Sequence, residues 1–310
     1  MIKKALVVEN LSKTYGKTGE RNKEINAIQN ISFSVNQGEI FGLLGPNGAG
    51  KTTFLNILAG TVIKTGGKIN VWGFDLDTNP RQVRASIGIV PQEVNLDAFF
   101  SPRDLLDLQA GLYGIKKKDI ITETILKMVA LDKHANSYSR SLSGGMKRRL
   151  LIAKAMVHQP PILILDEPTA GVDVELRQNL WKNVKKLNEL GVTILLTTHY
   201  LFEAQEMCDR IAIINKGNLV ELNTTQKLLQ KIKTKNVTIN FNEKIENLEI
   251  IFKDFKIISK NEREVTISIE KKSGNFESLI EVIKKNNLKP IDITTDDGNL
   301  EDVFIHLTKG

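Results

Sequence analysis

The stretch GPNGAGKT, residues 45–52, has the residue types and spacing of a phosphate-binding loop. It follows the apolar run EIFGLL and precedes TTFLNILAG, which predicts a strand, a loop and a helix that ends at Gly60. Glycines let successive backbone N–H groups converge on phosphate oxygens at the positive end of the helix. Lys51 is expected to reach the terminal phosphates of a nucleoside triphosphate, and Thr52 to offer its hydroxyl to Mg²⁺. The predicted nucleotide-contacting residues of this loop are Gly45, Pro46, Asn47, Gly48, Ala49, Gly50, Lys51, Thr52 and Thr53.

Polar side chains that could hydrolyse a bound nucleotide follow three other apolar runs. Asp166 and Glu167 come at the end of PILILDE, His199 follows VTILLTT, and Gln92 follows SIGIVP. Ligands of open α/β sheets lie at the carboxyl ends of the strands. Asp166 suits Mg²⁺, Glu167 suits a general base acting on the attacking water, and His199 could stabilise the γ-phosphate. Gln92, a neutral donor and acceptor, suits Mg²⁺ or the attacking water.

A second glycine pair lies in LSGGMKRRL, residues 142–150. Ser143 can cap a helix that runs towards Pro160, and Gly144 and Gly145 leave N–H groups exposed at its positive end. One face of that helix is apolar, with Met146, Leu150, Ala153 and Val157. Positive charge is expected one turn in, from Lys147, Arg148 and Arg149. Such a site favours an anion, although a capped helix start with a flexible lead-in remains an alternative.

The predicted helices and strands that position these residues follow two different patterns, one before and one after residue 225. Before residue 225, short apolar runs alternate with helical stretches, which predicts a mainly parallel sheet with crossover helices. ALVVENLS and NISFSV suggest an antiparallel portion near the N-terminus. After residue 225, the order of runs is β-α-β-β-α-β, typical of a small ferredoxin-like α+β unit. We therefore expect domains at 1–225 and 226–310.

The composition is that of a globular protein and does not identify a binding partner. The chain has 310 residues, 41% hydrophobic and 25% charged, with a net charge of +7. This charge fits phosphate ligands, an anionic membrane surface or nucleic acid. The single cysteine excludes an intrachain disulfide, and the four histidines show no metal-ligand spacing. The apolar stretch near the N-terminus is too short for a signal peptide. The other apolar runs have the length of core strands, so no membrane span is expected.

The ordered set of motifs resembles the nucleotide-binding subunit of an ATP-binding cassette (ABC) transporter. The set comprises Tyr15 in LSKTYG, GPNGAGKT, Gln92, LSGGM, LDEPTAGVD and His199. LSGGMKRRL, DEPTAGVD and the closing LEDVFIHLTKG are most similar to the ABC-2 type exporter group, which handles drugs and polysaccharides. The resemblance implies a P-loop ABC ATPase domain with a mainly parallel sheet and with antiparallel β and helical subdomains, and it implies ATP and Mg²⁺ as cofactors.

The same resemblance implies how the second glycine pair is used. Two copies would pair head to tail, so that Ser143, Gly144 and Gly145 contact the γ-phosphate held by the partner copy. Asp173 would lie at the seam of this dimer, and Tyr15 would stack on adenine. Glu167, His199 and Gln92 would carry out hydrolysis.

A transporter of this kind also needs a membrane partner. The resemblance implies a separate polytopic ABC-2 type permease, with this chain peripheral at the cytoplasmic face of the cell membrane. The docking segment would be EVNLDAFFSPRDLLDLQAGLYGI, where Phe99 and Phe100 either meet the permease or pack within a helical subdomain. The sequence shows no coiled-coil insertion or zinc module, so no nucleic-acid partner is expected. The C-terminal domain is expected to be an accessory or dimer-stabilising module, with ligand sensing as the alternative.

Overall fold

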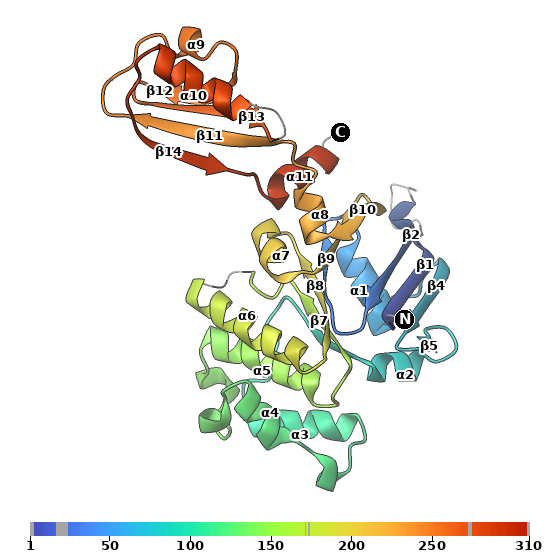
Figure 1. The fold of residues 1–310 in the computed structure, drawn as a ribbon. Helices are drawn as coiled ribbons and strands as arrows, with labels where there is room; N and C mark the ends of the chain where they lie inside the picture. Colours follow the sequence, from blue (N-terminus) through green and yellow to red (C-terminus); the bar gives the residue numbers. More distant parts are fainter. Residues whose placement is uncertain (1–2, 17–23, 171, 173, 272–274, 309–310) are drawn as a thin grey trace. The chain divides into compact units, whose positions relative to one another are not determined.

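The computed structural model describes residues 3–16, 24–170, 172, 174–271 and 275–308. The chain divides into two compact units, Met1–Thr224 and Thr225–Gly310. Each unit has its own hydrophobic core and is described by itself (Figure 1).

The centre of the first unit is a six-stranded sheet in the order β10-β9-β3-β8-β7-β6. Its strands are β3 (Ile40–Leu44), β6 (Ile87–Val90), β7 (Ile162–Asp166), β8 (Thr193–Thr198), β9 (Arg210–Asn215) and β10 (Asn218–Thr224). Neighbouring strands run parallel, except that β10 pairs antiparallel with β9. Every residue of β3 and β8 is buried, as expected for strands covered on both faces. The predicted parallel strands are confirmed, and their carboxyl ends meet at one edge of the sheet.

A second sheet in this unit is antiparallel, in the order β2-β1-β4-β5. It comprises β1 (Lys4–Tyr15), β2 (Ile25–Asn36), β4 (Gly66–Val71) and β5 (Phe74–Asp75). Its inner face packs against the helix α1 (Lys51–Ala59) and the main sheet in one core. Within that core, the Phe33 ring lies 5.5 Å from the rings of both Phe41 and Phe54. These contacts hold β2, β3 and α1 together and so fix the loop between β3 and α1.

The helical part of the first unit carries the second glycine pair. It contains α3 (Pro102–Leu112), α4 (Thr122–Met128) and α5 (Gly144–Met156), whereas α2 (Pro80–Ala85) packs on the core of the two sheets through Val83. The predicted apolar face of α5 is confirmed, because Leu150, Ala153 and Val157 are buried in a separate core and Met146 packs against it. Two further helices, α6 (Val174–Glu189) and α7 (Leu201–Met207), follow β7 and β8.

The second unit is a four-stranded antiparallel sheet in the order β12-β13-β11-β14. Its elements are α8 (Thr225–Leu229), β11 (Thr234–Phe241), α9 (Leu248–Ile251), β12 (Lys256–Asn261), β13 (Glu264–Glu270), α10 (Asn275–Lys285), β14 (Pro290–Asp296) and α11 (Leu300–Thr308). From β11 to β14 the elements follow the β-α-β-β-α-β order, with α9 reduced to a single turn. None of the described helices in either unit is long and apolar enough to cross a membrane.

Candidate active site

A cavity of ≈ 730 Å³ lies where the phosphate loop meets the carboxyl ends of the parallel strands. Nearly all of the predicted phosphate-loop residues line it, together with Gln92, Glu167 and His199. Sequence reasoning missed the wall on the other side, which comprises Ile25, Asn26, Ala27, Gln29 and Lys216. These residues belong to the start of β2 and the β9–β10 turn, and nothing in their types marks them as ligand contacts.

The phosphate loop needs its glycines for different reasons. Gly50 has φ +111°, and a Cβ there would lie 2.5 Å from the carbonyl oxygen of Ala27. A Cβ on Gly45 would lie 2.4 Å from the carbonyl oxygen of Ile214. Gly50 also starts α1 without a side-chain cap, and the first turn has no acidic residue. The N–H groups at this positive helix end are therefore available to an anionic ligand.

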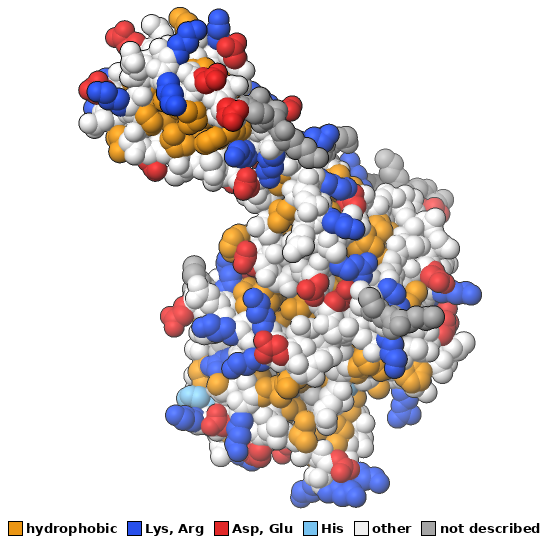
Figure 2. Space-filling view, viewed as in Figure 1, with side chains coloured by type: hydrophobic (Ala, Val, Ile, Leu, Met, Phe, Trp, Pro, Cys, Tyr) orange, Lys and Arg blue, Asp and Glu red, His pale blue; other side chains and the backbone are white. Residues whose placement is uncertain are grey.

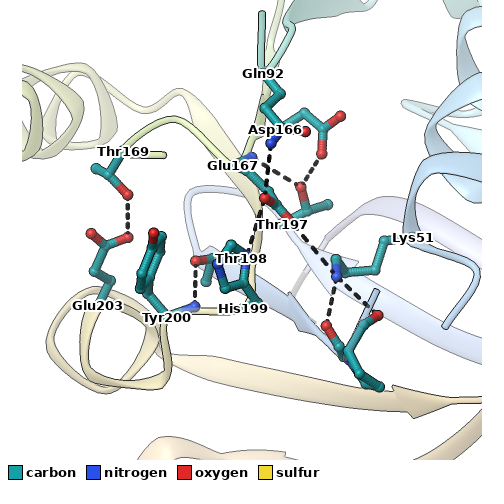
Figure 3. A network of polar contacts seen from close by, with 12 residues as sticks. Lys51, Gln92, Asp166, Glu167, Thr169, Thr197, Thr198, His199, Tyr200 and Glu203 are labelled. Carbon is teal, nitrogen blue, oxygen red and sulfur yellow. Dashed lines mark hydrogen bonds and ion pairs between the residues drawn. The ribbon is translucent and has the colours of Figure 1, made fainter. Parts of the chain in front are cut away.

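Lys51 is buried within this loop, with 5% of its surface exposed. Its Nζ donates to the carbonyl oxygens of Gly45 (2.6 Å) and Pro46 (3.3 Å) and lies 3.7 Å from Glu167 Oε1 (Figure 3). Burial lowers the pKa of the Lys51 ammonium, although Glu167 and Asp166 oppose that change. A phosphate placed beside this ammonium would offset the cost of burying it.

Glu167 brings three strand ends together. Its side chain is buried, its Oε2 accepts a hydrogen bond from Gln92 Nε2 (3.2 Å), and the same oxygen lies 3.1 Å from His199 Nδ1. Figure 3 shows Gln92, Glu167 and His199 converging from separate segments. The backbone of Glu167 has φ +43°, a left-handed conformation that costs about 1–2 kcal/mol for a residue with a Cβ. The fold therefore holds this carboxylate at the cavity wall at an energetic cost.

Asp166 is held by a residue that sequence reasoning missed. Its Oδ1 accepts a hydrogen bond of 2.5 Å from the hydroxyl of Thr197, which is fully buried on the neighbouring strand β8. Burial raises the pKa of the Asp166 carboxyl, and the bond from Thr197 opposes that change. Thr197 also accepts from the backbone N–H of Glu167, through its carbonyl oxygen (3.0 Å) and its hydroxyl (3.3 Å). The threonine pair before His199 was the signal in the sequence.

Tyr15 lies beside the site but is not among the residues that line the cavity. Its hydroxyl is 3.4 Å from Thr53 Oγ1, and Lys13 Nζ lies 4.7 Å from the centre of its ring. Residues 17–23, which begin two positions after Tyr15, are outside the described part.

The second glycine pair does not reach this cavity. Ser143 caps α5 as predicted, because its hydroxyl accepts from the N–H of Met146 (3.3 Å). Ser143 and Gly144 are exposed, and neither lines the cavity. Gly145 is buried, where a Cβ would lie 2.2 Å from Leu176 Cδ2 of α6. Asp173, predicted at a dimer seam, lies outside the described residues.

The prediction that Arg148 and Arg149 add charge to an anion site at Ser143 is wrong. Arg148 is 4% exposed and donates from Nη1 to the carbonyl oxygens of Pro91 (2.9 Å) and Gln92 (2.8 Å). Arg149 donates likewise to the carbonyl oxygens of residues 129 and 130, both at 2.9 Å. Both guanidinium groups point from the body of α5 onto neighbouring loops, so they hold those loops instead of the open helix end.

A phosphate loop, a buried lysine and the strand-end carboxylate of Glu167 line one cavity, and Asp166 precedes Glu167 at the same strand end. This arrangement defines a nucleoside triphosphatase of the P-loop class. The family described as ABC transporter matches residues 28–170. The linearmycin resistance ATP-binding protein LnrL of Bacillus subtilis (strain 168) is 38% identical over 229 residues, 73% of this chain and 71% of that protein. The Nod factor export ATP-binding protein I of Rhizobium etli is 36% identical over 234 residues, 75% of this chain and 72% of that protein.

Solved structures agree with these relatives. An ATP-binding subunit of an ABC transporter superposes with a TM-score of 0.62 at 28% identity, covering 73% of this chain and 92% of that one. A dimeric ATP-binding cassette in a post-hydrolysis state bound to ADP and Pi gives 0.62 at 28% identity, covering 71% and 98%. This chain belongs to the ATP-binding cassette family of transporter ATPases, and it binds and hydrolyses ATP.

Proposed function

We propose that this chain is the ATP-hydrolysing subunit of a membrane exporter of the ABC-2 type. It would act at the cytoplasmic face of the cell membrane as a peripheral protein, with a separate polytopic permease. The relatives whose names mention linearmycin resistance and Nod factor export support the assignment to export. The observation that carries the proposal is the convergence of Lys51, Gln92, Glu167 and His199 on one cavity beside the phosphate loop.

The arrangement supports a specific division of labour among these residues. Lys51 and the N-terminus of α1 would bind the terminal phosphates. Glu167, whose carboxylate already interacts with Gln92 and His199, would take the proton of the attacking water as general base. His199 would stabilise the γ-phosphate, and Gln92 would orient the water.

Mg²⁺ fits the donor set at this site. In such sites, the ion usually takes one or two carboxylates together with phosphate oxygens and waters. The Thr52 hydroxyl, exposed in the cavity, would hold it with Gln92 and the Asp166 carboxylate that Thr197 orients. When bound, the ion neutralises charge that develops on the phosphates.

The second glycine pair supports a head-to-tail dimer. Ser143 and Gly144 are exposed and lie outside their own chain's cavity, so their N–H groups are available to the γ-phosphate of a second copy. A Cβ on Gly144 would meet nothing within 4 Å, which leaves that approach open. Gly145 would serve mainly to let α5 pack closely on α6. We place Asp173 at the seam of this dimer and Tyr15 against adenine.

The permease would dock on the helical part of the first unit. Phe99 is 72% exposed and Phe100 is 37% exposed, so an apolar partner is a better account of Phe99 than internal packing. Lys/Arg and Asp/Glu side chains are interspersed over the face shown in Figure 2, which does not form the continuous basic surface of a nucleic-acid site. Residues 1–225 would carry the ATPase, and residues 226–310 an accessory or dimer-stabilising module.

The test combines turnover with capture of the partner. Glu167→Gln should retain ATP binding, lose turnover and accumulate as a dimer in size-exclusion chromatography with ATP. Lys51→Ala, the matched control, should lose ATP binding, and Ser143→Arg should bind ATP without dimerising. From gently solubilised membranes, tagged Glu167→Gln should recover a polytopic membrane protein in near-stoichiometric amount. Recovery of ribosomes or nucleic-acid proteins instead would overturn the exporter assignment, and turnover at the parental rate would exclude Glu167 as the base.

A further inference from the structure

A buried carboxylate near the active site has no role in the chemistry described above. Glu203, in the first turn of α7, is 3% exposed and does not line the nucleotide cavity. Its Oε2 accepts a hydrogen bond of 2.6 Å from the hydroxyl of Thr169 (Figure 3). Its Oε1 lies 3.2 Å from Arg177 Nε of α6, although neither of these two atoms has a hydrogen-bond partner among the described residues. Glu203 thus joins α7 to the segment after Glu167 and to α6.

Burying this carboxylate is costly, so its contacts need an explanation. Burial raises the pKa of Glu203, and the bond from Thr169 and the charge of Arg177 only partly oppose that change. An apolar side chain of similar size would fill the same space at lower cost. What an apolar side chain could not do is join the three segments by directional polar contacts.

The location of these contacts shows what they hold in place. Strands β7 and β8 pair as far as Asp166 and Thr197. Beyond this pair the two chain paths separate, one into a turn closed by the bond from Ala170 N–H to the Glu167 carbonyl oxygen (3.2 Å), the other into α7. Glu167 and His199 lie where the paths separate, and Glu167 Oε2 is 3.1 Å from His199 Nδ1. Thr169–Glu203 is a second cross-link between the same two paths, outside the nucleotide cavity.

A ring contact extends the connection to the histidine. The Tyr200 ring lies 4.2 Å from the His199 ring, and the Arg177 guanidinium lies 5.6 Å from the Tyr200 ring centre. Arg177 therefore contacts both Glu203 and the residue next to His199.

We propose that Glu203, through Thr169 and Arg177, is a positioning residue for ATP hydrolysis that fixes Glu167 relative to His199. This inference rests on the proposed roles of Glu167 and His199. It assigns Glu203 no contact with nucleotide, so nucleotide affinity and turnover should respond differently to its loss.

The experiment compares variants of the 310-residue chain. Thr169→Val removes one hydroxyl at nearly constant volume, and Thr169→Ser keeps it. Glu203→Gln keeps an acceptor for Thr169 but removes the charge opposite Arg177, and Glu203→Ala removes both. We expect Thr169→Val and Glu203→Ala to lower kcat about tenfold or more, since small displacements of reacting groups carry costs of this size. Thr169→Ser should keep nearly parental kcat, and Glu203→Gln should fall between. KM for ATP and the affinity for a non-hydrolysable ATP analogue should stay within about twofold of the parent, because the phosphate loop is untouched.

The possible results distinguish a positioning role of Glu203 from a role in stability alone, and they distinguish failure of this inference from failure of the proposed function. Rates are measured well below each variant's unfolding temperature, so a fully folded Thr169→Val with parental kcat would overturn the inference even if Glu203→Ala does not fold. An equal rise in KM and loss of analogue affinity would also overturn it. If Glu167→Gln, assayed under the same conditions, keeps the parental turnover rate, the proposed role of Glu167 is wrong and the inference about Glu203 has no basis. If Glu167→Gln is inactive while Thr169→Val is unaffected, only the role of Glu203 fails.

Discussion

The sharpest prediction concerns Arg148, whose two bonds hold the loop that carries Gln92. Arg148→Met keeps an unbranched apolar stem and removes the guanidinium, so the carbonyl oxygens of Pro91 and Gln92 lose their donor. Arg149→Met is a matched control on the same helix, because Arg149 makes the same number of carbonyl bonds at 2.9 Å to a loop that carries no active-site residue.

The expected loss of stability follows from those bonds. Hydrogen bonds from a charged donor contribute about 1.5–3 kcal/mol each, so two give roughly 3–6 kcal/mol before the cost of burying the charge. Burial lowers the pKa of Arg148, which shows that this cost is present. We therefore expect Arg148→Met to lower the free energy of unfolding by about 2–3 kcal/mol. Arg149 is less buried than Arg148, and its bond to the carbonyl oxygen of residue 130 is exposed to water, so about 1 kcal/mol is expected there.

Turnover should separate the two arginines more clearly than stability does. Freeing the Gln92 loop weakens the 3.2 Å contact between Gln92 and Glu167, so Arg148→Met should lower kcat about tenfold, with little change in the affinity for ATP. Arg149→Met should keep parental kcat. The assays are urea unfolding and steady-state ATP hydrolysis at a temperature where both variants are folded. Equal kcat in the two variants would refute the reasoning. So would full recovery of kcat in Arg148→Lys, because the lysine stem is shorter and its compact, strongly hydrated ammonium is a poor replacement for Nη1 at this buried position.

Gly50→Ala should destabilise more than Gly48→Ala in urea unfolding, since both have positive φ but only Gly50 faces a carbonyl oxygen, that of Ala27, at 2.5 Å; equal losses would contradict this. Thr197→Val should cost about 1–3 kcal/mol of unfolding free energy by removing the donor to the half-buried Asp166 carboxylate, and a loss below roughly 0.5 kcal/mol would show that this bond does not stabilise the fold. Burial is the main cause that lowers the pKa of His158 below 6.5, so stability should fall as pH drops through 6.5, because the unfolded chain then binds more protons. His158→Gln should weaken that pH dependence in unfolding measured from pH 7.5 to 5.5, and an unchanged slope would refute it.

The features that could be predicted from the sequence are those that depend on residues close together along the chain. The phosphate loop is readable because its glycines, lysine and threonine lie within residues 45–52, between an apolar strand and a helix. The parallel strands are readable because runs such as ILIL are apolar at every position. The residues after those strands were predictable as site residues because strand ends meet at one edge of a sheet.

The tertiary structure decided which side chains support the site. Thr197 bonds to Asp166, Arg148 to the Gln92 loop, and Glu203 to Thr169, all across large sequence separations. Spacing along the chain does not encode these pairs, because each partner is set by where one element packs against another. Arg148 shows the difference: its charge beside a glycine pair predicted an anion contact, yet its side chain leaves the body of α5 towards the loop that carries Gln92. The order of residues along the chain therefore identifies the groups that bind and hydrolyse ATP. The packing of the helices against the sheet determines which other side chains hold those groups in position.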